Sequence, residues 1–337
     1  MDGAGRSSRV ERAAAGCLRA AAGALRRLPS PLAYGCADAA LPAVCAWALV
    51  HELRAARRGR GARRNLRIAY REELGGGARW RLLARHARHL VHLGVDLCRM
   101  PRLDAGRLGR HVDVAALERL RELLGRGRGL VCVSGHVGVW ELLGHAASVW
   151  GLPVTVLVRR PRARALDGLL RELRTSGGQR CVAQRGGLVG LSRALARGEI
   201  AGLLADEDAP VEGVFSPFLG TLAASSTTAA WLQRRSGAPI AVVSCERTAR
   251  ERYRIRLWRV IEPGPTSEGE RSRVTAEINA ALGEAIRARP AQWLWGARRF
   301  ATRPPRERAD AGGLPPRAGG VPPRAAGVPP RAGGASA

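Results

Sequence analysis

A histidine and a glutamate in one short segment have the types and spacing needed for acid–base chemistry. His136 and Glu141, with four residues between them, lie in GLVCVSGHVGVWELLGHAAS, residues 129–148. The apolar run before His136 predicts a strand, and a helix is expected to begin near Val139. A loop histidine can then meet a carboxylate in the first helical turn, which fixes the imidazole tautomer and stabilises its protonated form. We interpret His136 as a general base and Glu141 as its partner; the alternative is a hydrogen-bonded structural histidine.

The elements that must position this pair alternate between two hydrophobic patterns. Such alternation predicts an α/β fold whose sheet is covered by helices on both faces. Sites in these sheets lie at the carboxyl ends of strands, which is where His136 is placed. Strands are predicted at 130–134, 153–158, 179–183, 200–205, 239–245 and 253–261, and helices near 139–149, 165–176, 187–197, 223–236 and 271–289.

The N-terminal part of the chain contains a candidate membrane segment. Residues 28–50 are apolar and about long enough to cross a bilayer, but three prolines and Asp38 weaken that interpretation. The segment also lacks the small-residue exit of a cleaved signal peptide. A half-buried membrane anchor and a pair of core helices in a soluble domain both fit these residues.

The stretch that follows, residues 54–88, is strongly basic, with 12 arginines against two glutamates. It suits an anionic bilayer surface; the alternative is a solvated helix face.

The overall charge points to a polyanionic partner. The chain has 337 residues, of which 56 are basic and 28 acidic, for a formal net charge of +28. All the basic residues are arginine, which excludes a Walker-type phosphate loop and a lysine Schiff base. Nucleic acid, an anionic membrane surface and an acidic protein would each suit this charge. The chain has only 4% aromatic residues and no recognised nucleic-acid-binding motif, so a nucleic-acid partner is not expected. A basic nucleic-acid-binding protein remains the alternative from a different functional class.

Cysteines and histidines give no metal-binding pattern. The seven cysteines are scattered without a C-x-x-C spacing, which is typical of small apolar residues in a reducing compartment. His86, His89 and His92 recur every third residue before Asp96, and this spacing sweeps around a helix instead of converging on one point. We therefore expect an amphipathic helix face, no metal and no cofactor.

Five blocks of sequence occur in one characteristic order. They are SGHVGVWE at 134–141, the arginine-rich stretch 157–178, GEIAGLLADEDAPVEGVFSPFLG at 198–220, SGAPIAVV at 236–243 and PAQWLWGARRFATRPP at 290–305, with Arg-Asn-Leu at 64–66 ahead of them. Together they resemble the lipid A biosynthesis late acyltransferase family, a branch of the lysophospholipid acyltransferase superfamily with a His-x4-Glu signature. The resemblance covers roughly residues 15–305.

The resemblance implies one acyltransferase domain, residues 61–303, with a mixed central sheet flanked by helices. A helical membrane-associating segment, residues 1–60, is expected before it, and the PPR-repeat composition of residues 304–337 predicts a disordered tail after it. The implied reaction moves a fatty acyl group from acyl carrier protein or acyl-CoA to a hydroxyl of a lipid A precursor or related glycolipid, at the cytoplasmic face of the cell inner membrane. A phosphatidylinositol-mannoside-type glycolipid is the alternative acceptor.

The resemblance also implies roles for individual residues. His136 would take the proton of the acceptor hydroxyl as it attacks the thioester, while Glu141 orients the imidazole. Arg174, and secondarily Arg160, match the arginine block and could hold an acceptor phosphate or the developing oxyanion; the alternative for any arginine is a surface position.

Three further residues are expected near the site. Asp206 ends a strand in the family's Asp block, where it either organises the site or acts as a structural cap. Phe218 and Gly220 are expected to shape the acyl-binding wall, or else simply to pack. The sequence departs from the family pattern at four positions, where Val139, Glu207, Leu219 and Ala297 replace the usual Asn, Gln, Phe and His. None removes His136 or Glu141, so a non-catalytic family member is not expected, although acceptor specificity transfers less well.

Overall fold

The computed structural model describes residues 3–304 apart from 58–59, 72, 162, 212, 266 and 268, with side chains from residue 11 onward. The predicted disordered tail lies, from residue 305, outside the described residues. The proposed division into residues 1–60, 61–303 and 304–337 stays a prediction.

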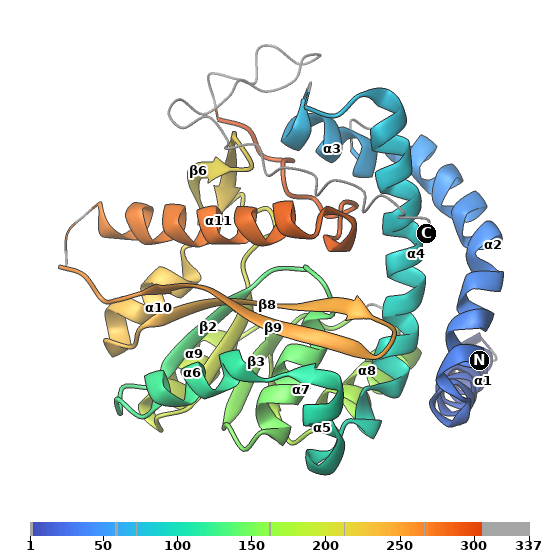
Figure 1. The fold of residues 1–337 in the computed structure, drawn as a ribbon, viewed down its shortest axis with the longest axis horizontal. Coiled ribbons are helices and arrows are strands. Elements are labelled where there is room, and N and C mark those ends of the chain that lie inside the picture. The colour runs from blue at the N-terminus through green and yellow to red at the C-terminus, as the bar shows by residue number, and fades with distance from the viewer. Residues whose placement is uncertain are drawn as a thin grey trace, which may run out of the picture.

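A seven-stranded mixed sheet forms the centre of the molecule (Figure 1). Its strand order is β1-β9-β8-β2-β5-β3-β4, and the five strands from β8 to β4 run parallel. Strand β9 pairs antiparallel to β8, and β1 pairs parallel to β9. The strands are β1 (Val112–Asp113), β2 (Leu130–Ser134), β3 (Val154–Val158), β4 (Arg180–Ala183), β5 (Ile200–Leu204), β8 (Ile240–Ala249) and β9 (Arg252–Ile261). The predicted α/β fold with a mixed sheet is confirmed.

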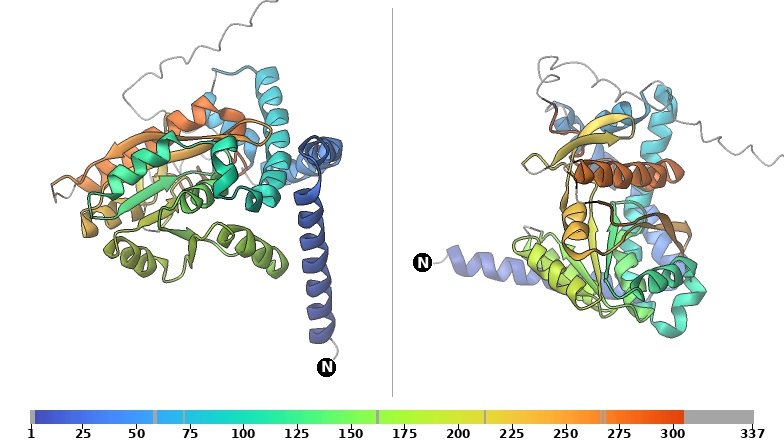
Figure 2. Two further views of the ribbon diagram at one scale, coloured as in Figure 1. Left: turned by 60° about the horizontal axis from the view of Figure 1, so that its bottom comes forward. Right: turned by 90° about the vertical axis from the view of Figure 1, so that its left-hand side faces the viewer.

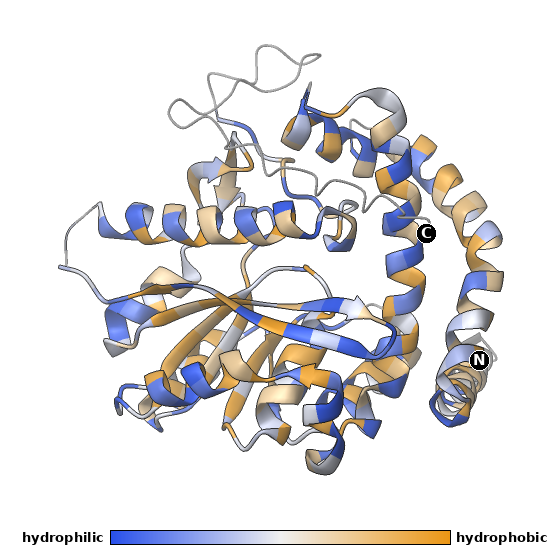
Figure 3. Cartoon of the chain, in the orientation of Figure 1, coloured by the Kyte–Doolittle hydropathy of each residue, from blue (hydrophilic) through white to orange (hydrophobic). Residues whose placement is uncertain are grey.

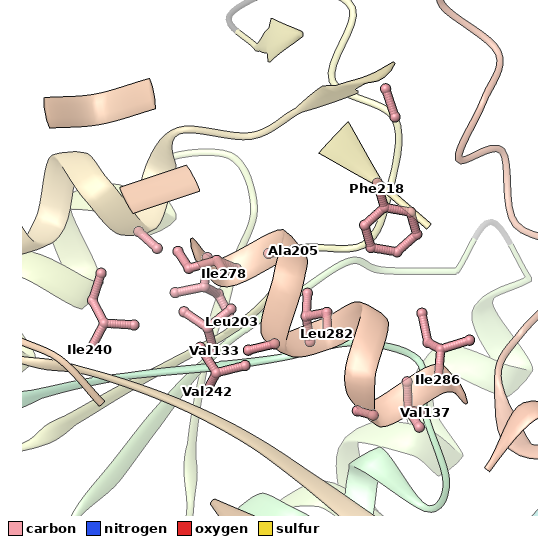
Figure 4. Packing of buried hydrophobic residues seen from close by; sticks show 14 of the residues in the cluster. Val133, Val137, Leu203, Ala205, Phe218, Ile240, Val242, Ile278, Leu282 and Ile286 are labelled. Atoms are coloured by element: carbon pink, nitrogen blue, oxygen red, sulfur yellow. The ribbon is translucent and has the colours of Figure 1, made fainter. Parts of the chain in front are cut away.

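The sheet is buried on both faces, so its central strands are almost wholly apolar. On β2, Val131 and Val133 enter the core beneath α9, α10 and α11, whereas Leu130 and Cys132 enter the core beneath α6, α7 and α8. Figure 4 shows Val133 beside Leu203 of β5 and Val242 of β8, with Ile278 of α11 nearby. The covering helices are α6 (Ala115–Leu124), α7 (Trp140–Val149), α8 (Arg164–Thr175), α9 (Gly187–Ala196), α10 (Thr228–Ser236) and α11 (Glu270–Ala288); a short α5 (Ala105–His111) precedes β1.

A two-stranded hairpin corrects the helix predicted over residues 223–236. Strands β6 (Val214–Phe218) and β7 (Thr221–Ser225) pair antiparallel, and α10 begins only after them. The turn residues Leu219 and Gly220 have φ angles of 49° and 77°, as a two-residue type I′ turn requires. Helical spacing in residues 223–227 was misleading because pairing with the adjacent strand β6, across the two-residue turn, determines their conformation.

Four N-terminal helices lie along one side of the domain: α1 (Gly3–Arg27), α2 (Ser30–Ala56), α3 (Ala62–Tyr70) and α4 (Gly76–Arg99). Helix α2 packs along α4, and α1 extends away from the body (Figures 1 and 2). Among the described residues, α2 is the helix long and apolar enough to cross a membrane, and only 17% of its most apolar window is buried. Its apolar residues gather in the half beside α3 (Figure 3).

A buried carboxylate fixes the first half of α2 to the domain. Asp96 of α4 accepts hydrogen bonds from the hydroxyls of Tyr34 and Tyr253, the latter at 2.8 Å, and from Arg247 Nε at 2.7 Å. Arg247 also contacts His89 Nδ1 at 3.0 Å. The network therefore joins α2, α4 and the β8–β9 ribbon.

The three α4 histidines have separate partners. His86 Nδ1 lies 3.2 Å from the carbonyl oxygen of Ala291, His92 Nε2 lies 2.8 Å from Asp38, and His89 contacts Arg247. Burial lowers the pKa of His86 to about 4, which keeps its imidazole neutral. All three are buried, so they belong to the packed side of α4.

Candidate active site

The loop between β2 and α7 carries His136 and is fixed by the closing segment and by β8. The backbone N–H of Gly138 donates to the carbonyl of Gln292 at 2.9 Å, and that of Val139 donates to the carbonyl of Cys245 at 2.7 Å. Gly138 has a φ of 68°, and a Cβ at this position would overlap the Cys245 carbonyl. A glycine is therefore required for the loop to lie this close to β8.

The hydrogen-bonding partner of His136 is Asp206, directly beyond the neighbouring strand β5. His136 Nδ1 lies 2.8 Å from Asp206 Oδ1, and the backbone N–H of His136 donates to Oδ2 at 2.7 Å. The indole N–H of Trp293 also donates to Oδ2, at 2.7 Å. Asp206 is fully buried. Because the carboxylate occupies Nδ1, the imidazole has Nε2 left for a substrate.

The charges of this pair support each other. Burial alone lowers the pKa of His136, but the adjacent Asp206 carboxylate more than offsets this, so the pKa lies above its ordinary value. Burial raises the pKa of Asp206. The charge of His136, the hydrogen bonds from its ring and its backbone N–H, and the hydrogen bond from Trp293 lower this pKa by more, so it lies below its ordinary value. The imidazole is therefore a stronger base than a free histidine, and its protonated form is stabilised in place.

Glu141 does not form the hydrogen bond with His136 expected from the sequence. Its two carboxylate oxygens accept from Arg174, at 2.8 Å from Nε and 2.5 Å from Nη2. This pair is mostly buried, with 13% and 14% of the two side chains exposed. Glu141 stands in the first turn of α7 and α8 packs beside it, so its carboxylate meets an arginine of the next helix. Asp206 takes the position beside His136 because β2 and β5 are neighbours in the sheet.

A cavity of about 440 Å³ opens beside both pairs. It runs along the strands beneath α7: Val154 and Ile200, at the starts of β3 and β5, line one end. His136, Glu141, Arg174 and other polar residues line the end where the strands finish. An apolar interior with a few convergent polar groups is typical of a ligand pocket of this size. Its shape suits a hydrocarbon chain whose polar end lies against His136.

The other predicted site residues lie elsewhere. Arg160 is exposed, whereas its neighbour Arg159 lines the cavity. Phe218 is buried, with its ring centroid 5.8 Å from that of Trp293, so it packs behind Asp206. Gly220 is an exposed residue of the β6–β7 turn. The structure thus brings together His136, Asp206, Glu141 and Arg174, and it places the remaining three outside the cavity lining.

Two residues of the closing block support the site without having been singled out from the sequence. Trp293 holds Asp206, as described. Arg299 is fully buried beneath the hairpin, where it donates to the Ala224 carbonyl and to Ser225 Oγ, both at 2.6 Å. Burial lowers the pKa of Arg299 to about 10. The P-x-Q-W-x-W and Arg-Arg pattern of residues 290–299 is the sequence signal that could have identified both.

Comparisons with known proteins agree with this geometry. The model of the bacterial lipid A biosynthesis acyltransferase family matches residues 20–302. The chain is 28% identical over 247 residues to the lipid A biosynthesis palmitoleoyltransferase of Escherichia coli (strain K12), covering 72% of this chain and 78% of the relative. It is 28% identical over 202 residues to the lauroyltransferase of the same organism, covering 59% and 64%. It is 27% identical over 203 residues to the phosphatidylinositol mannoside acyltransferase of Mycolicibacterium smegmatis, covering 58% and 64%.

The family match takes in the His136 loop, the Asp206 segment and the closing block that supports them, as the resemblance predicted. The chain is therefore an acyltransferase and belongs to the bacterial lipid A biosynthesis acyltransferase family.

Proposed function

We propose that this acyltransferase moves a fatty acyl group from a thioester of acyl carrier protein or coenzyme A to a hydroxyl of a membrane glycolipid. A lipid A precursor is the first candidate acceptor, because two of the relatives above carry that activity in their names. A phosphatidylinositol mannoside is the second, through the mycobacterial relative. The observation that carries the proposal is the His136–Asp206 pair at the polar end of an apolar cavity.

In the proposed reaction, His136 Nε2 accepts the proton of the acceptor hydroxyl as its oxygen attacks the thioester carbonyl. Asp206 stabilises the imidazolium that forms and keeps the proton on Nδ1. The tetrahedral intermediate then collapses, the C–S bond breaks, and the departing thiolate takes the proton from Nε2. The products are an ester and a free thiol, and the enzyme returns to its starting protonation state.

The Glu141–Arg174 pair has a second role in this proposal. Glu141 engages Nε and Nη2 of Arg174, which leaves Nη1 for a substrate oxygen. A guanidinium in a largely dry cavity wall stabilises a developing oxyanion more strongly than one in water. Glu141 is thus a positioning residue for Arg174, and its charge also adds a small upward shift to the pKa of His136.

We further propose that α2 anchors the enzyme peripherally on the cytoplasmic face of the inner membrane without crossing it. Its first half carries Asp38, which pairs with Arg88 and His92, and moving this cluster into hydrocarbon is costly. The second half, from Pro42 to Ala56, is about 22 Å long and cannot span a core of about 30 Å. That half exposes Trp47, Leu49, Val50 and Leu53, so it can enter the head-group boundary.

The first test assays the purified full chain with acyl carrier protein and coenzyme A thioesters, offered separately, on a lipid A precursor and on a phosphatidylinositol mannoside in micelles. Mass spectrometry identifies the acylated product. His136→Ala is expected to lower turnover by roughly 10²–10⁴ because the general base is lost. His111→Ala, at a histidine that contacts the Glu251 carbonyl, is the matched control. A folded His136→Ala enzyme with wild-type turnover would refute the mechanism.

The second prediction concerns pH. The base acts only when unprotonated, so activity rises with pH through the pKa of His136, which Asp206 holds above the ordinary value. Asp206→Asn removes the charge and leaves the burial, so the acidic limb of kcat/KM moves to lower pH while kcat falls by roughly 10²–10⁴. Asp113→Asn, at an exposed carboxylate paired with Arg254, serves as the control. An unmoved limb in Asp206→Asn would assign the titration to another group.

The third prediction separates structure from catalysis at Glu141 and Arg174. Glu141→Gln leaves a mostly buried guanidinium without its counter-charge and is expected to cost about 3 kcal/mol in urea unfolding. The double variant Glu141→Leu/Arg174→Met removes both charges and recovers most of that stability. The turnover of the double variant stays low, because no cation faces the developing oxyanion. Wild-type turnover in the stable double variant would show the pair to be purely structural.

The fourth prediction tests the anchor without deleting buried contacts. Trp47, Leu49 and Leu53 are 64%, 46% and 52% exposed, so replacing all three by serine leaves the unfolding midpoint nearly unchanged. Sedimentation with vesicles of phosphatidylethanolamine and phosphatidylglycerol is expected to show that the triple variant binds at least about tenfold more weakly than the wild type. Leu166→Ser, at an exposed leucine of α8, is the control. A triple variant that binds as the wild type does would place the anchor elsewhere.

A further inference from the structure

A second cavity, of about 520 Å³, meets the first at its polar end. The two cavities share six residues in their linings: three leucines, 157, 203 and 204, and the polar residues Arg159, Gln184 and Glu207. Arg159 donates to Gln184 Oε1 at 3.2 Å and pairs with Glu207 at 2.7 Å, so these three side chains form the partition between the cavities. Glu207 directly follows Asp206, which places the partition next to the His136–Asp206 pair.

The two cavities lie under different helices. Residues of α7 and α8 cover the first, whereas α9 and α10 contribute to the second. Since these helix pairs cover opposite faces of the sheet, two ligands can approach the ends of β3 and β5 from opposite sides. This arrangement suits a transferase with two substrates, because the acyl carbonyl and the attacking hydroxyl can meet at one base without competing for the same volume.

The lining of the second cavity differs in chemistry from that of the first. Ser226, Thr227 and Thr228 line it, and so does Trp231, which is 38% exposed. Its charged residues are two arginines, 159 and 271, and two carboxylates, Asp208 and Glu207. Equal numbers of each sign favour a neutral ligand over a polyanion. Hydroxyl and carboxylate oxygens accept hydrogen bonds from a polyhydroxylated ligand, and a flat indole packs against its C–H face.

We propose that this second cavity binds the sugar head group of the acceptor glycolipid and directs its hydroxyl past the Arg159–Glu207 partition toward His136 Nε2. The proposal rests on the acyl transfer proposed above and adds the place of the second substrate. The other occupant that chemistry allows is the amide arm of the thioester carrier. A sugar ring makes use of the flat indole face and of the several hydroxyl-bearing residues beside it, which a slender amide arm does not require.

Trp231→Ala, Trp231→Phe and Thr228→Val test the assignment, with Arg193→Ala, at an exposed residue of α9 outside the cavity lining, as the control. Three quantities are measured: KM for the glycolipid acceptor, KM for the acyl thioester, and the slow hydrolysis of the thioester without acceptor. The probe acceptors are the lipid A precursor and the phosphatidylinositol mannoside named above. Trp231→Ala is expected to raise the acceptor KM about tenfold, with Phe restoring part of the loss and Thr228→Val giving a smaller rise.

Donor KM and acceptor-free hydrolysis should stay at wild-type values in all four variants. A rise in donor KM with unchanged acceptor KM would assign the cavity to the carrier arm and overturn the proposal. Unchanged values for both substrates in Trp231→Ala and Thr228→Val would also overturn it. Failure of the underlying acyl transfer is recognised separately, because the wild-type enzyme would then acylate neither glycolipid.

Discussion

A carboxylate that water does not reach organises the edge of the sheet that carries the candidate active site. Asp206 is fully buried, and an unpaired charge in that position would be strongly destabilising. Its oxygens are therefore satisfied by the His136 ring, by the backbone of His136 and by the Trp293 indole. The donors come from the β2 loop and from the closing segment, so compensating one charge fixes both of these and the end of β5 relative to one another.

A second buried carboxylate extends this order to the N-terminal helices. Asp96 gathers Tyr34 of α2, Tyr253 of β9 and Arg247 of β8. The backbone of Arg247 exchanges two hydrogen bonds with the Gln292 side chain, and the carbonyl of Gln292 accepts from Gly138 in the loop that follows β2. A continuous series of polar contacts thus connects the apolar helix α2 with the loop that carries His136.

The sequence predicted the elements well and the contacts between them less well. Short apolar runs located the six long strands of the sheet, and the end of β2 correctly marked His136, because local patterns determine both. Spacing along the chain suggested Glu141 as the partner, since it is near in sequence, but Asp206 is 70 residues away and adjacent only through strand order. The β6–β7 hairpin was missed for a different reason: its two strands are adjacent in the chain, but the helical spacing of residues 223–227 hid their pairing with residues 214–218. The resemblance to a known family had drawn attention to Asp206, yet only the fold shows which atom it holds.

The attachment of α2 has a geometric consequence for an enzyme that works on a surface. Tyr34 and Asp38 fix the first half of this helix to α4, which sets the position of its exposed outer half relative to the His136 loop. If that half lies in the bilayer boundary, the height of His136 above the hydrocarbon is a constant of the fold. Substrates are then selected by depth as well as by chemistry: a hydroxyl at the right level of the head-group layer is within reach, and an identical hydroxyl a few ångströms higher or lower is not.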